Sequence, residues 1–310
     1  MPEPSPFAFA CPRCRSPLEQ LSPDEMSCPV DGVRCRREGG IWRMLLPERE
    51  PAFAQFRREY ETVRLAEGRG EANPDYYRAL PYRDLTGRMA EDWKIRAASC
   101  DALVEKVVSP LEQRLRRPLR ILDLGAGNGW LSNCLALLGH AVAAVDLADN
   151  DFDGLGCFRY YASAVVPVQA EFDHLPFLDG SADLVIFNAS LHYSVDYSVT
   201  LSEAYRVACS PGLLAVMDSP VYTDQASGAR MVQERQREFE KKYGFPSNAL
   251  PSENYLTYLR LGELAAGLGM RCQLITPSYG LQWRLRPLKA RLLGRREPAK
   301  FHIILFSSPE

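Results

Sequence analysis

The feature that most constrains the fold is a repeated alternation of apolar runs and helical segments between residues 119 and 218. Five runs have strand length: Leu119–Leu124, Ala141–Leu147, Ala164–Gln169, Asp183–Asn188 and Leu213–Asp218. Near-continuous apolar strands separated by helices are typical of a parallel sheet that is covered on both faces. Two further runs, Arg271–Thr276 and Phe301–Ser307, follow near the end of the sequence. We therefore predict an α/β fold with a doubly wound, Rossmann-like seven-stranded sheet and an antiparallel last strand.

The composition is that of a soluble globular protein. Apolar residues make up 46% and charged residues 25% of the 310 residues, which is too apolar for disorder. The 37 basic and 39 acidic side chains leave a net charge of −2, so the chain as a whole has no field that holds nucleic acid. No window approaches the roughly 18 consecutive apolar residues of a membrane span, and the first residues do not resemble a secretory signal. We expect a cytoplasmic protein without a membrane span.

Changes in composition divide the chain into three parts. The N-terminal part carries four of the nine cysteines and too few large apolar side chains for a core of its own. The second part has helical spacing, including a helix over Met89–Val108 that we expect Pro110 to end. The predicted parts are a zinc-ribbon-like module (1–47), a helical linker and lid (48–110), and a main domain (111–310) that contains a lid insertion (219–262).

A glycine-rich loop follows the first predicted strand of the main domain. Gly125, Gly127 and Gly129 stand where a buried strand turns into a helix, and glycine lets a ligand approach the main chain closely. Asp146 ends the next strand, 21 residues after Gly125. A carboxylate at that position can accept hydrogen bonds from two ribose hydroxyls. The pair of features predicts a nucleotide-like cofactor, although a tight turn without a ligand is the simpler alternative.

The segment from Leu119 to Ser219 resembles the class I S-adenosylmethionine-dependent methyltransferases of type 11, whose first motif is an acidic residue followed by Gly-x-Gly-x-Gly. Three further segments agree with that family in the same order. Glu171–Phe177 resembles its adenine motif, Asp183–Asn188 its fourth strand, and Pro211–Ala215 the turn into its fifth strand. The resemblance implies S-adenosylmethionine (SAM) as the cofactor.

The resemblance also implies where each part of SAM lies. Asp123 and the glycine loop face the methionine moiety, and Asp146 holds the ribose. Glu171 accepts a hydrogen bond from the adenine amine, while the Phe172 amide meets a ring nitrogen. The implied cofactor residues are Asp123, Gly125, Ala126, Gly127, Gly129, Asp146, Leu147, Glu171, Phe172 and Asn188.

The segment after the fourth predicted strand holds the candidates for catalysis. Methyl transfer from a sulfonium is an in-line displacement, so the site mainly aligns a nucleophile and excludes water. A base is needed only when the attacking atom must lose a proton. His192 titrates near neutral pH and could act as that base or as a substrate donor, with Tyr193 beside it. Both side chains could instead pack the loop against the cofactor, and the sequence leaves the two interpretations open.

The N-terminal cysteines have the spacing of a zinc ribbon. Cys11 and Cys14 form a Cys-x2-Cys knuckle, and Cys28 offers a third thiolate. The fourth ligand is open, because Cys35 would close the site with a longer loop, whereas Asp31 stands where ribbons usually repeat the knuckle. Thiolates dominate structural zinc sites. We therefore predict one structural zinc bound by Cys11, Cys14, Cys28 and Cys35.

The sequence is compatible with three alternative functions. The first is a methyltransferase of a small organic substrate, with an aromatic-rich helical lid. The second is a ribosomal or transfer RNA methyltransferase that binds RNA through the ribbon, and seven basic residues against one Glu between Arg284 and Lys300 favour it. The third is a catalytically inactive binding module. The net charge of −2 favours the first function. The substrate, the methylated atom (O, N or C) and the oligomeric state are left open.

Overall fold

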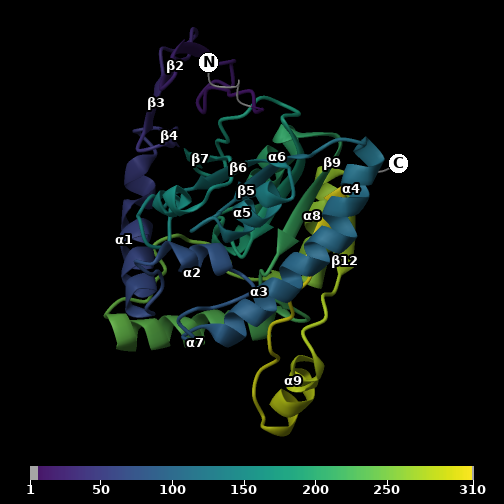
Figure 1. Ribbon diagram of the computed structural model, residues 1–310. Helices are drawn as coiled ribbons and strands as arrows, with labels where there is room; N and C mark the ends of the chain where they lie inside the picture. The colour runs from purple at the N-terminus through teal and green to yellow at the C-terminus, as the bar shows by residue number, and fades with distance from the viewer. Residues whose placement is uncertain (1–5, 309–310) are drawn as a thin grey trace.

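A long mixed sheet organises the computed structural model, which describes residues 6–308 (Figure 1). Its eleven strands lie in the order β1-β2-β3-β4-β7-β6-β5-β8-β9-β13-β12, and β10 pairs with β11 separately. The strands are β1 (Glu19–Ser22), β2 (Glu25–Ser27), β3 (Arg34–Glu38), β4 (Ile41–Arg43), β5 (Arg120–Leu124), β6 (Ala141–Asp146), β7 (Val165–Gln169), β8 (Ala182–Asn188), β9 (Ala208–Met217), β10 (Val221–Tyr222), β11 (Leu256–Thr257), β12 (Arg271–Ile275) and β13 (Ile303–Ser307).

The seven predicted strands form the Rossmann-like part of this sheet. Strands β7, β6, β5, β8 and β9 run parallel, and β13 enters antiparallel between β9 and β12. The predicted fold with its antiparallel last strand is therefore confirmed. Because the central strands are parallel, β5, β6 and β8 end side by side at Leu124, Asp146 and Asn188. The residues that follow them meet at one edge of the sheet.

Helices cover both faces of the sheet. They are α1 (Glu50–Ala66), α2 (Pro74–Ala79), α3 (Ala90–Leu103), α4 (Ser109–Leu115), α5 (Trp130–Leu137), α6 (Tyr197–Val207), α7 (Gln225–Tyr243), α8 (Tyr258–Leu268) and α9 (Leu281–Leu292), with the π-helix η1 (Val104–Val108) and the 3-10 helices η2 (Leu155–Tyr160) and η3 (Leu191–Tyr193). One core packs α6 and α8 on the sheet, and the other packs α2 to α5. In Figure 1, α1 stands at the left and α7 runs along the bottom. Among the helices of residues 6–308, none combines the length and apolar character needed to cross a membrane.

The prediction that Pro110 ends a helix is wrong. Helix α3 continues through the π-helix η1 into α4, whose first turn contains Pro110. A proline inside an α-helix lacks an amide donor and clashes with the preceding turn. The wider π turn over Val104–Val108 precedes the proline, so a local change of helix type accommodates it.

The N-terminal module is joined to the sheet rather than separate from it. Strand β4 pairs in parallel with β7, with Trp42 opposite Val168. The Phe9 ring packs between Trp42 and Phe177, at centroid distances of 5.8 and 5.5 Å. Burying an aromatic side chain of this size contributes about 1.5–3 kcal/mol. The module therefore covers what would otherwise be an open strand edge at β7.

Candidate functional site

The glycine-rich loop joins β5 to α5 and is held against the end of β6. The amides of Gly125 and Ala126 both donate to the Val145 carbonyl oxygen, at 2.8 and 3.1 Å. Gly125 has φ +76°, and a Cβ there would lie 2.3 Å from the Cβ of Ser190. Only glycine lets the chain turn this closely beneath the segment that follows β8.

Asp146 ends β6 with its carboxylate facing the glycine loop. Its Oδ2 accepts from the Gly127 amide at 2.8 Å, and its Oδ1 accepts from the Ala148 amide at 2.7 Å. Burial raises the pKa of Asp146, while these two amide donors oppose the shift. Each carboxylate oxygen can still accept a second hydrogen bond. The geometry fits the ribose hydroxyls that a nucleotide-like cofactor would offer.

Asp123 supports the loop from below. It is fully buried, and the Ser132 hydroxyl at the start of α5 donates to its Oδ2 at 2.6 Å. Within residues 6–308 its Oδ1 has no hydrogen-bond partner, and burial raises the pKa of Asp123 to about 7. The structure thus shows Asp123 tying β5 to α5. Its implied contact with the methionine moiety stays a prediction.

A cavity of about 360 Å³ lies between the ends of the strands and α1. Five of the implied cofactor residues line it together: Gly125, Asp146, Leu147, Glu171 and Phe172. Helix α1 and the N-cap residue before it supply the opposite wall, with Arg49, Phe53, Phe56, Arg57 and Tyr60. The remaining implied residues support the cavity without lining it: Asp123, Ala126, Gly127, Gly129 and Asn188. Its volume lies within the range of about 300–1,000 Å³ that is usual for small-molecule sites.

Glu171, the implied adenine acceptor, has a partner that the sequence analysis missed. Arg49, at the start of α1, donates to both of its carboxylate oxygens, from Nε and Nη2, at 2.7 Å each. The Glu171 side chain is 4% exposed, so this pair compensates a buried charge. Arg49 stands 122 residues earlier in the chain. No local pattern indicates the pair.

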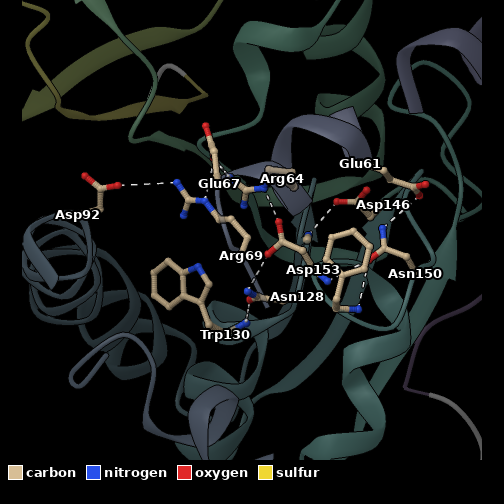
Figure 2. A network of polar contacts seen from close by, with 12 residues as sticks. Glu61, Arg64, Glu67, Arg69, Asp92, Asn128, Trp130, Asp146, Asn150 and Asp153 are labelled. Carbon is tan, nitrogen blue, oxygen red and sulfur yellow. Dashed lines mark hydrogen bonds and ion pairs between the residues drawn. The ribbon is translucent and has the colours of Figure 1, made fainter. Parts of the chain in front are cut away.

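Arginines of α1 also hold the acidic loop after β6. Arg57 donates to Asp149 at 2.7 Å. Figure 2 shows Arg64 reaching Asp153, which in turn accepts from Asn128 of the glycine loop at 3.1 Å. Arg57 and Arg64 are seven residues apart, so they share one helix face. That spacing opposite an acidic loop is the signal that could have predicted the contact.

His192 and Tyr193 lie on η3, but only Tyr193 faces the cavity. The Tyr193 ring packs against Phe56 and Tyr60 of α1, at centroid distances of 5.6 and 5.9 Å. His192 is buried behind it, and its Nδ1 lies 3.3 Å from the Ser219 hydroxyl. Burial, with a smaller effect of the Arg235 charge, lowers the pKa of His192 to about 3. The imidazole is therefore neutral near pH 7, and this arrangement favours packing.

The N-terminal cluster includes Asp31 in place of Cys35. One ligand atom each of Cys11, Cys14, Cys28 and Asp31 lies within 4.8 Å of all the others. Cys35 belongs to β3, where the alternation of the strand turns its side chain into the core. The prediction of Cys35 as fourth ligand therefore disagrees with the structure. Asp31 follows Cys28 at the spacing of a Cys-x2-Cys knuckle, and this spacing indicates Asp31 as the alternative fourth ligand.

The fold and the cavity together define a class of protein. A parallel sheet with a glycine-rich first turn, an acidic second strand end and a cavity beyond the strand ends is a Rossmann-like nucleotide-cofactor site. A family model described as a methyltransferase domain, of type 11, matches residues 122–216.

Relatives of known function extend the comparison. Over 139 residues the chain is 34% identical to malonyl-[acyl-carrier protein] O-methyltransferase of Geobacter sulfurreducens, a stretch that covers 43% of this chain and 51% of that protein. The enzyme of the same name from Erwinia billingiae is 30% identical over 136 residues, covering 41% and 48%. The chain thus spans about half the length of these relatives. The structure of 1,6-didemethyltoxoflavin-N1-methyltransferase from Burkholderia thailandensis matches with a TM-score of 0.46 and 15% identity, over 94% of this chain and 99% of that one.

The protein carries a class I SAM-dependent methyltransferase domain. SAM is the cosubstrate of this class, which confirms the family and the cofactor predicted from the sequence.

Proposed function

We propose that the protein transfers a methyl group from SAM to a small organic substrate within the cavity under α1. The observation that carries the proposal is that Asp146, the glycine loop and Glu171 converge on one wall, while aromatic side chains of α1 form the other. The curated relatives act on malonyl-[acyl-carrier protein], but the half-length match leaves the substrate of this chain to be inferred from its own cavity.

The residues present fit SAM. Asp146 has free acceptor capacity for the ribose, and Glu171 keeps one acceptor site on each oxygen for the adenine amine. The bound cofactor would supply an activated methyl group on a sulfonium. The chain's own part is to bind, to align the nucleophile and to exclude water. Phe56, Tyr60 and Tyr193 perform that exclusion.

We assign Tyr193 a contact with the substrate and His192 a positioning role. Tyr193 lines the cavity, whereas His192 packs against the Tyr193 ring in a tilted arrangement, with ring centroids 4.3 Å apart. The alternative role for the neutral His192 imidazole is that of a general base, which applies to substrates that must lose a proton. Replacement of His192 by Gln separates the roles, because a positioning residue changes KM and kcat without changing the pH profile.

Binding of S-adenosylhomocysteine tests the proposal. Asp146→Ala removes both implied ribose contacts, and loss of a charged hydrogen-bond partner costs about 1.5–3 kcal/mol, or about ten- to a hundred-fold in Kd. Asp151→Ala on the same loop is the matched control, because Asp151 is exposed and pairs only with Arg159 among the described residues. Calorimetry should show weak binding for the first variant and unchanged binding for the second. Equal affinities in the two variants would contradict the assignment.

We further propose that Cys11, Cys14, Cys28 and Asp31 bind a structural zinc. Three thiolates and one carboxylate are a suitable tetrahedral donor set. The Cys14 and Cys28 sulfurs lie 3.4 Å apart, and the Cys11 sulfur lies 3.3 Å from an Asp31 oxygen. Because the module has few apolar side chains of its own, metal binding would contribute directly to its folding.

The two alternative functions receive less support. The basic run between Arg284 and Lys300 includes α9, which lines neither the cofactor cavity nor the cysteine cluster. An inactive binding module does not explain a cavity lined by five cofactor residues. The cytoplasmic location expected from the sequence stays a prediction.

A further inference from the structure

A second, smaller cavity adjoins the cofactor cavity. Its volume is about 130 Å³, and it shares four wall residues with the larger one: Phe56, Tyr60, Tyr193 and Leu250. The remaining walls come from the end of α1, from α7 and from the segment 247–254. The two cavities are therefore neighbours, with these four side chains between them.

Three arginines line the smaller cavity, and they differ in their partners. Arg64 pairs with Asp153, and Arg69 pairs with Glu67 at 3.1 Å. Arg235 of α7 has no carboxylate within 4 Å among residues 6–308. Its Nη2 donates to Asn254 Oδ1 at 2.7 Å, and its Nε is buried without an acceptor.

An unpaired guanidinium N–H at a cavity wall calls for an acceptor from a ligand. A buried donor without a partner costs about 1–3 kcal/mol, a cost that an incoming oxyanion removes. Guanidinium groups favour carboxylates and phosphates because the planar donors match two oxygens. The shared aromatic walls, Phe56, Tyr60 and Tyr193, suit a flat apolar body between the anion and the cofactor.

We infer that Arg235 and the smaller cavity bind the acidic group, a carboxylate or a phosphate, of an aromatic substrate. The inference rests on the proposed function, since it places the substrate next to SAM. Helix α7 then has a defined role, because it brings the specificity residue to the wall of the smaller cavity. After burial, the charge of Arg235 is the second cause that lowers the pKa of His192, which agrees with a cationic Arg235 close to that residue.

Paired acidic and neutral probes test this inference on the full chain. Benzoate, phenyl phosphate and the neutral benzamide are titrated by ligand-observed NMR, with and without S-adenosylhomocysteine. We expect at least one acid to bind wild type about tenfold or more tightly than benzamide, the strength of one charged hydrogen bond. Arg235→Met should remove the preference, whereas Arg237→Met, an exposed arginine on the same helix, should keep it.

Three outcomes overturn the inference. The first is no binding of either acid, and the second is a preference that persists in Arg235→Met. The third is that Arg235 binds the carboxylate of the cofactor and not that of a substrate. If Arg235→Met weakens S-adenosylhomocysteine but not 5′-methylthioadenosine, which lacks the amino acid, then Arg235 serves the cofactor. Failure of wild type to bind S-adenosylhomocysteine would instead refute the proposed function, so the two failures are distinguishable.

An independent observation concerns α9, which projects from the body of the protein between β12 and β13 (Figure 1). Its leucines recur at intervals of four, three and four residues, which places them on one face of the helix. They are strongly exposed: Leu281 69%, Leu285 48%, Leu288 56% and Leu292 78%. A contiguous apolar face of this kind on a projecting helix indicates an interaction surface.

Basic side chains surround this apolar face. A hollow of about 680 Å³ between α7 and α9 is lined by Arg230, Arg286, Lys289, Arg295 and Arg296. Its one acidic wall residue, Glu234, pairs with Arg296. Arg284 and Arg291 are exposed on α9 itself. The local surface is thus strongly positive in a chain whose net charge is −2.

The geometry points to an anionic lipid bilayer as the partner of α9. A helix with leucines on one face and Lys or Arg beside them lies in a membrane interface with its apolar face inserted. Each basic side chain near an anionic surface adds about 1 kcal/mol. Nucleic acid would use the charges but would leave the leucines exposed, so the leucine face favours a bilayer over RNA.

Vesicle co-sedimentation of the full chain tests this second inference. Wild type should bind phosphatidylcholine–phosphatidylglycerol vesicles and not phosphatidylcholine alone, and high salt should weaken the binding. The double variant Leu285→Asp/Leu292→Asp should bind about tenfold or more weakly, since two inserted leucines are lost. Leu259→Asp on α8, 74% exposed, is the control and should bind like wild type. No binding to anionic vesicles, or unchanged binding by the double variant, overturns the inference. Transfer RNA binding that the double variant retains would identify a nucleic-acid surface and overturn it as well.

Discussion

Gly125 offers a direct test of how the glycine loop shapes the cofactor cavity. Replacement by alanine adds a Cβ that would lie 2.3 Å from Ser190 Cβ, 2.9 Å from Ser190 Oγ and 3.3 Å from Phe172 Cζ. The backbone cannot relax easily, because the Gly125 amide donates to the Val145 carbonyl. Ser190 and Phe172 must therefore move, and both line the cavity.

The expected decrease in the free energy of unfolding has two parts. The left-handed backbone at φ +76° costs alanine about 1–2 kcal/mol, and overpacking typically adds about 1–3 kcal/mol. We expect Gly125→Ala to lower the free energy of unfolding by about 2–5 kcal/mol. Gly180→Ala is the matched control, because Gly180 has φ +67° but its nearest neighbour would lie 3.7 Å from the new Cβ. Only the backbone cost of about 1–2 kcal/mol applies there.

Urea unfolding of both variants separates the backbone cost from the clash. The double variant Gly125→Ala/Ser190→Gly supplies the second check, because Ser190→Gly removes the two nearest atoms that the new Cβ meets. The double-mutant cycle should recover about 1–3 kcal/mol of coupling between the two positions. Calorimetry should show weakened S-adenosylhomocysteine binding for Gly125→Ala alone. Equal destabilisation by Gly125→Ala and Gly180→Ala, or additive effects in the cycle, would refute the reasoning.

Three further predictions follow from the same structure. His192 takes up a proton near pH 6.5 when unfolded but only near pH 3 when folded, so the free energy of unfolding should fall as pH drops below 6.5, by at most about 1.4 kcal/mol per pH unit. His192→Phe should reduce that slope by the contribution of His192, and an unchanged slope would refute the burial argument. Elemental analysis should find near-stoichiometric zinc in wild type and in Cys35→Ser but much less in Asp31→Ala, and the reverse order would restore Cys35 as the ligand. Trp42→Ala should cost about 3–5 kcal/mol in urea unfolding because the side chain is buried between module and sheet, whereas Trp283→Ala on the projecting helix should cost far less.

The parts of the fold and of the site that could be predicted are those that depend on residues close together in the sequence. The five parallel strands are mainly apolar, because both faces of the sheet are covered, so each appears as a compact run. The glycine loop and Asp146 lie at ends of adjacent strands, and their spacing in sequence reflects that adjacency directly. Residues from one wall of the cavity could therefore be assigned from the sequence.

The opposite wall could not be predicted in the same way. Helix α1 lies far before the glycine loop in the sequence, and its arginines meet carboxylates that only the fold brings near. The Arg49–Glu171 pair joins residues 122 positions apart. Charged residues before or within a helix are usually solvent-facing, so nothing local distinguishes Arg49 from a solvated residue. For the same reason the sequence does not indicate Arg235, whose buried Nε has no acceptor among the described residues.

The position of the N-terminal module connects the proposed metal site to the cofactor cavity. Strand β4 lies beside β7, and its Arg43 contacts Asp149 on the loop after β6. Six residues later Arg49 pairs with Glu171, which stands just beyond β7. Because zinc would contribute folding energy to the module, loss of zinc should release β4 and leave Glu171 without its buried partner. If the module binds zinc as proposed, the metal would therefore support the side of the cavity that we assign to adenine.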